Sequence, residues 1–133
     1  MANTVTRQTI VDGPRWLVVK IHINSDGTEE TGLELITAAD YDPPFVKSAL
    51  MALDYSMTGG FHAKLMWQGT PNKDIVALSP DTSINKNWEE IGGLVNDALG
   101  ATGDILLETT GIANTDEITL ILHIAKRDRP AGF

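Results

Sequence analysis

Apolar and polar residues alternate with a period of two along most of this chain. In the run 16–24 one face carries Leu17, Val19, Ile21 and Ile23, and the other carries Trp16, Val18, Lys20 and His22. Such alternation is typical of a strand with one buried face. The same period predicts further strands at 31–37, 48–57, 61–67 and 73–78, and within 103–111 and 116–126.

The segments between these runs contain turn residues. Asp26-Gly27 lies between two apolar runs and predicts a hairpin joining 16–23 to 31–37, because Gly tolerates the positive φ of a tight turn. Thr58-Gly59-Gly60 predicts a second hairpin in the same way. Residues 82–102 lack alternation and are interpreted as a long loop that holds one or two helical turns.

These elements predict an all-β fold. About eight strands, with turn signals every 8–15 residues and no amphipathic helix, favour a single antiparallel β-sandwich that is jelly-roll-like. The 133 residues match one domain, 1–133, for which we consider an N-terminal arm at 1–10 and a C-terminal tail at 126–133. We see no targeting segment and no membrane-spanning run.

Charge and cysteine content narrow the classes of partner. The chain has 18 acidic and 10 basic residues, for a net charge of −8, which disfavours binding to nucleic acid or to anionic lipid. It has no cysteine, so disulfides, zinc–thiolate sites and thiol nucleophiles are excluded.

The search for catalytic chemistry yields no candidate. His22, His62 and His123 fall on separate predicted strands, and the paired carboxylates all fall in predicted turns or loops. The glycine-rich stretch 92–103 lacks the Gly-Lys-Ser/Thr ending of a phosphate loop. We therefore expect no enzyme activity, no metal and no cofactor. Trp67 shares a face with Leu65 and is expected in the core.

Four segments of the chain resemble a known group of proteins. NTVTRQTIVDGPRWLVVKIHI, FHAKLMWQG, IGGLVNDALGATGDILLETTG and EITLILHIAKR resemble small virion proteins of tailed double-stranded DNA phages, most specifically in TIVDGPR and in the GGL…TGDILL block. The resemblance implies a capsid decoration (cement) protein that binds the major capsid protein on the outside of the head. Its expected location is the virion, after synthesis in the host cytoplasm. We expect a homo-oligomer on the shell, a trimer in preference to a dimer.

Two segments and one side chain are the expected contacts with such a shell. Thr4, Val5 and Arg7 lie in a β-prone segment that would add to a neighbour's sheet edge, unless 4–10 is a strand of the domain itself. The basic residues Lys126, Arg127 and Arg129 would orient the protein on an acidic surface. Trp16 lies opposite a buried face and would meet a partner. The alternative function is a carbohydrate-binding or adhesive module of a phage fibre or tail.

Overall fold

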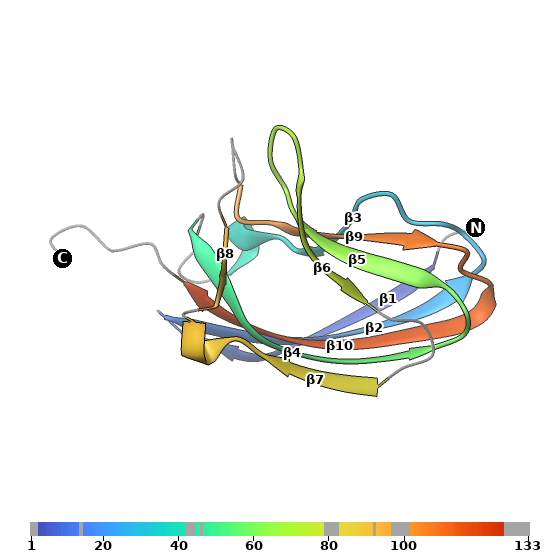
Figure 1. Cartoon of the computed structure of the whole chain (residues 1–133), viewed down its shortest axis with the longest axis horizontal. Coiled ribbons are helices and arrows are strands. Elements are labelled where there is room, and N and C mark those ends of the chain that lie inside the picture. Colours follow the sequence, from blue (N-terminus) through green and yellow to red (C-terminus); the bar gives the residue numbers. More distant parts are fainter. Residues whose placement is uncertain are drawn as a thin grey trace, which may run out of the picture.

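The chain folds into two antiparallel β-sheets that pack face to face (Figure 1). The computed structural model describes residues 3–13, 15–41, 45, 47–78, 83–91, 93–96 and 102–126. The strands are β1 (Thr4–Asp12), β2 (Trp16–Asp26), β3 (Leu33–Ile36), β4 (Ser48–Thr58), β5 (His62–Trp67), β6 (Lys73–Leu78), β7 (Ser83–Asn87), β8 (Leu94–Val95), β9 (Ile105–Thr110) and β10 (Asn114–Lys126). Two short 3-10 turns, η1 (Ala38–Asp40) and η2 (Glu89–Ile91), complete the described part.

The strand order is that of a jelly roll, which confirms the predicted fold class. The six-stranded sheet runs β1-β2-β10-β4-β7, with β8 paired beside β4, and the four-stranded sheet runs β3-β9-β5-β6. The eight strands β2–β7, β9 and β10 complete the jelly roll. β1 is an additional strand at the edge of the six-stranded sheet.

One hydrophobic core lies between the sheets, and the alternation of the sequence fills it. Leu17, Val19 and Ile21 of β2 are fully buried, as their shared face predicted. Trp67 is 2% exposed and lies among them from the opposite sheet, which confirms its core position. No helix in the described ranges is both long and apolar enough to cross a membrane.

Both predicted hairpins are wrong. β2 and β3 belong to different sheets, and so do β4 and β5, so the glycine-containing turns carry the chain from one layer to the other. Gly27 and Gly59 do have positive φ angles, 93° and 110°, but a sheet-to-sheet crossing uses that conformation as well as a hairpin does. β2 pairs instead with β1 and β10.

The alternation of β4 is interrupted by a bulge. The register shifts where His123 and Ile124 of β10 meet Ala52 and Leu50, so that Leu50 enters the main core. Met51 packs with Ala49 and Ala125 in a separate small cluster. Part of the predicted long loop is also strand, because β7 and β8 pair with β4 on either side of the turn η2.

Candidate functional site: the β1 edge and the outer face of the six-stranded sheet

The predicted N-terminal contact segment lies in β1. Residues 4–12 pair with β2 from Thr4 opposite Asn24 to Asp12 opposite Leu17. Within the described part of the chain β1 has no neighbour on its other side. The segment is therefore the edge strand of its own sheet, and the hypothesis of a free arm at 1–10 does not hold for residues 4–10.

Two of the three predicted contact residues in β1 point toward the domain itself. Arg7 Nε donates a hydrogen bond to the Leu35 carbonyl oxygen at 3.1 Å, and its Nη2 donates to the carbonyl of Glu34. These bonds link the edge of the six-stranded sheet to β3 of the other sheet. Val5 packs against the core, whereas Thr4 is exposed.

Exposed apolar side chains gather at the other end of β1. Ile10 is 52% exposed, Val11 44% and Trp16 45%, and we call these three residues the apolar patch. Val11 lies opposite Val18, which shares the outer face of β2 with Trp16. Sequence reasoning found Trp16 but missed Ile10 and Val11, although three β-branched residues in a row, Thr9 to Val11, break the alternation there.

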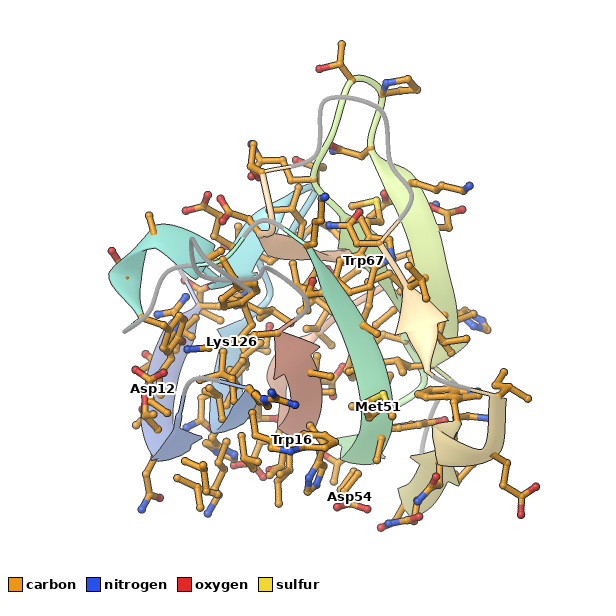
Figure 2. The ribbon with its side chains drawn as sticks, turned by 90° about the vertical axis from the view of Figure 1, so that its left-hand side faces the viewer. Asp12, Trp16, Met51, Asp54, Trp67 and Lys126 are labelled. Atoms are coloured by element: carbon orange, nitrogen blue, oxygen red, sulfur yellow. The ribbon has the colours of Figure 1, made fainter. Side chains whose placement is uncertain are left out.

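Lys126 is not on the surface, which corrects its predicted role. Its side chain is 1% exposed, and Nζ lies 2.7 Å from Asp12 Oδ1 (Figure 2). Nζ also lies 5.6 Å from the centroid of the Phe45 ring. The ammonium group therefore pairs inside the chain and is not presented to a partner. Arg127 and Arg129, the other two residues of the predicted basic cluster, lie outside the described residues.

A groove of about 730 Å³ lies beside Arg7 on the side of β3. Its acidic residues are already engaged, because Glu29 accepts hydrogen bonds from the backbone of Gly111 and Ile112. Hydrogen bonding to the Asp104 carboxyl, with burial and the negative charge of Asp104, raises the pKa of Glu34. Across the described ranges no three His, Asp or Glu side chains gather as metal ligands would.

The fold and this surface define the class: a jelly-roll β-sandwich with an added edge strand and an exposed apolar patch. No protein-family model matches the chain, and neither does any curated protein.

Three solved structures are similar to this chain at a low level. A cupin superfamily protein from Desulfitobacterium hafniense DCB-2 is 12% identical, with a TM-score of 0.37 over 96% of this chain and 82% of that chain. KdgF from Halomonas sp. is 10% identical, with a TM-score of 0.37 over 93% and 80%. The C-terminal family 22 carbohydrate-binding module of Clostridium thermocellum Xyn10B is 14% identical, with a TM-score of 0.40 over 92% and 85%. Similarity at this level says nothing about function.

Proposed function

We propose that this protein is a non-catalytic structural protein that binds the outside of a tailed-phage capsid and stabilises the junctions between shell subunits. The observation that carries the proposal is β1, an added strand that is exposed along eight of its nine residues and carries two of the three residues of the apolar patch. The resemblance of four sequence segments to small phage virion proteins supports the same function.

An open edge strand offers a simple mode of attachment. The outer side of β1 presents backbone N–H and C=O groups that a strand of the shell can pair with, and such pairing supplies affinity without a pocket. Soluble proteins normally protect long edge strands with lysine, proline or a covering segment. β1 contains neither lysine nor proline, and its bulge between Thr9 and Val11 alters only one end.

The apolar patch supplies the anchor beside this edge. Tryptophan at the centre of an interface contributes most when surrounding contacts exclude water from it. The backbone of Trp16 is held in place because it pairs with Ala125 of β10 and its carbonyl oxygen accepts a hydrogen bond from Gly13 N at 2.9 Å. Little conformational freedom is therefore lost on binding. Several copies that bridge neighbouring subunits, as in a trimer, would be retained more strongly than one contact allows.

Co-sedimentation with undecorated heads, assembled from the major capsid protein of the same phage, tests this proposal. We expect Trp16→Ala, and separately the double variant Ile10→Lys/Val11→Lys, to weaken binding by about tenfold or more, as loss of an interface anchor does. Ile91→Ala is the matched control for loss of exposed apolar surface, since Ile91 is 71% exposed and lies in η2. Thr110→Lys, on β9 of the other sheet, is the control for an added lysine.

Circular dichroism of each variant confirms folding before binding is measured. Unchanged binding by folded patch variants, or equal losses in the two controls, would overturn the assignment of β1 and the apolar patch as the docking surface. Failure of the unmodified protein to bind heads at all would overturn the proposed function itself.

A further inference from the structure

A hollow lies on the outer face of the six-stranded sheet, away from β1. It has a volume of about 450 Å³ and lies over β4, β7 and β10. Two cross-strand rows line it: Ile121, Asp54 and Asn85 in one, and Thr119, Ser56 and Ser83 in the next. Directly paired residues project from the same face of a sheet. The three short hydroxyl side chains therefore leave space beside the longer row, which explains the hollow.

The polar groups around the hollow are held in fixed orientations. Asn85 Nδ2 donates a hydrogen bond to Asp54 Oδ1, and Asp54 Oδ2 lies 3.5 Å from His123 Nε2. On the adjoining row, Thr119 Oγ1 is 2.9 Å from His22 Nδ1. The Asp54 side chain remains 38% exposed, so an oriented carboxylate and amide face solvent together. In binding sites, the side chains that contact the ligand are likewise held in place by hydrogen bonds to neighbouring side chains.

The composition of the hollow selects the class of ligand. Ile121 provides an apolar surface, while a carboxylate, an amide and three hydroxyls provide hydrogen-bond acceptors and donors around it. Among the described residues, no lysine or arginine lines the hollow. The chain also has a net charge of −8, and both features disfavour the binding of a polyanion. A sugar ring has the complementary arrangement, with C–H groups on its faces and hydroxyls at its edge.

We propose that this hollow binds one neutral hexose unit of a glycan. The hydroxyls of the sugar pair with Asp54 and Asn85, and the ring packs on Ile121. The site goes beyond the proposed docking function, because a head protein that also binds sugar would hold the particle to glycan-coated surfaces.

The sugar site and the docking surface lie apart. In the order β1-β2-β10-β4-β7 the hollow is at the β7 side and the docking edge is at the opposite side. Trp16 points to the same side of the sheet as Asp54 (Figure 2), but the register places it four residues along β10 and two strands across. At ~3.3 Å per residue and ~4.8 Å per strand, that separation is about 16 Å, so one ligand ring does not touch both.

NMR titration of the ¹⁵N-labelled protein tests the sugar site, with maltotriose, cellotriose, mannotriose and N-acetylchitotriose as probes. We expect at least one to bind saturably and to shift the amide signals of Asp54, Asn85 and Thr119. Asp54→Asn and Asn85→Ala should each weaken that binding by about tenfold, as loss of a hydrogen bond to a charged or fixed group does. Asp74→Asn is the matched control, since Asp74 is likewise ion-paired, to Lys64, but lies on the other sheet.

Capsid binding by the same variants separates this proposal from the docking function. Hollow variants that lose sugar binding but still bind heads support two independent sites. The sugar site is overturned if none of the four probes binds saturably, if the shifts map elsewhere, or if Asp54→Asn binds sugar like the control. If the unmodified protein binds none of the sugars and the hollow variants no longer bind heads, the hollow is a contact with the capsid protein and not a sugar site.

Discussion

At the scale of single residues, the ion pair between Lys126 and Asp12 has unequal partners. The Lys126 side chain is 1% exposed and that of Asp12 is 25% exposed. Removal of the aspartate takes away the carboxylate that lies 2.7 Å from a buried ammonium, whereas removal of the ammonium leaves a carboxylate that water can reach. Breaking a buried pair on one side is the costly case.

We therefore expect Asp12→Ala to lower the free energy of unfolding by about 3 kcal/mol, and Lys126→Met to lower it by clearly less. Denaturant unfolding monitored by fluorescence measures both. Lys64→Met, which removes a half-buried lysine whose partner Asp74 is exposed to solvent, is the control and should change stability by about 1 kcal/mol or less. Equal effects of Asp12→Ala and Lys126→Met would contradict the buried position of the ammonium.

Two adjacent glycines make another residue-scale test, at the crossing between β4 and β5. Gly59 has a φ of +110°, and a Cβ there would lie 2.3 Å from Asp116 Oδ1, while a Cβ on Gly60 would meet nothing within 4 Å. Gly59→Ala should cost about 2–4 kcal/mol of unfolding free energy, from backbone strain and the clash. Gly60→Ala should change it by about 0.5 kcal/mol or less. Similar thermal melting of the two variants would contradict this geometry.

Glu34 predicts a pH dependence of stability. Hydrogen bonding to Asp104 raises its pKa above the ordinary value of 4.5, so the folded chain binds this proton more tightly than the unfolded chain does. The contribution to stability is therefore greatest below 4.5 and is lost as pH rises through the folded pKa.

Glu34→Gln should melt at a slightly higher temperature than the unmodified protein at pH 7. The corresponding gain in the free energy of unfolding should be less than about 1 kcal/mol, because the group is exposed. The difference should vanish when the melts are repeated below the ordinary glutamate pKa. A difference that persists unchanged at acidic pH would contradict the proton shared with Asp104.

At the scale of elements, β1 differs from the other strands of its sheet. Among the described strands it pairs only with β2, nearly all its side chains are exposed, and it is anchored by Val5, Arg7 and Asp12. β2 and β10 pair on both sides and bury every second residue. Strands with little buried area open locally before the rest of the fold.

Hydrogen–deuterium exchange should therefore show fast exchange across β1 and slow exchange in β10. Deletion of residues 1–9, which retains Asp12, should leave a folded jelly roll of reduced stability, because β2–β7, β9 and β10 are all intact. A deletion variant without β-sheet circular dichroism would show that β1 is required for the core to form.

At the scale of the whole molecule, the sheets are assembled from residues that are distant in sequence. Ile23 of β2 lies opposite Ile118 of β10, and β3 pairs with β9. Closing such long loops costs entropy before the contacts form, which makes folding slow.

We expect refolding in milliseconds to seconds, or more slowly, and not in microseconds. Stopped-flow tryptophan fluorescence can follow it, because Trp67 becomes 2% exposed in the folded state. A microsecond refolding phase with the full amplitude would contradict a mechanism limited by long-range strand pairing.

The sequence by itself determined which residues face the core wherever a strand runs without a bulge. Side-chain direction alternates along a strand, so a local pattern was enough to place Leu17, Val19 and Trp67 inside and Trp16 outside. The local pattern does not determine which strands pair, because the apolar face of each strand could pack beside several other strands. Tertiary structure alone therefore decided that Gly27 and Gly59 connect two sheets, that β1 completes its own sheet, and that Lys126 is buried against Asp12. The hollow could not be predicted from the sequence either, because only the register of three strands brings Asp54, Asn85 and Thr119 together.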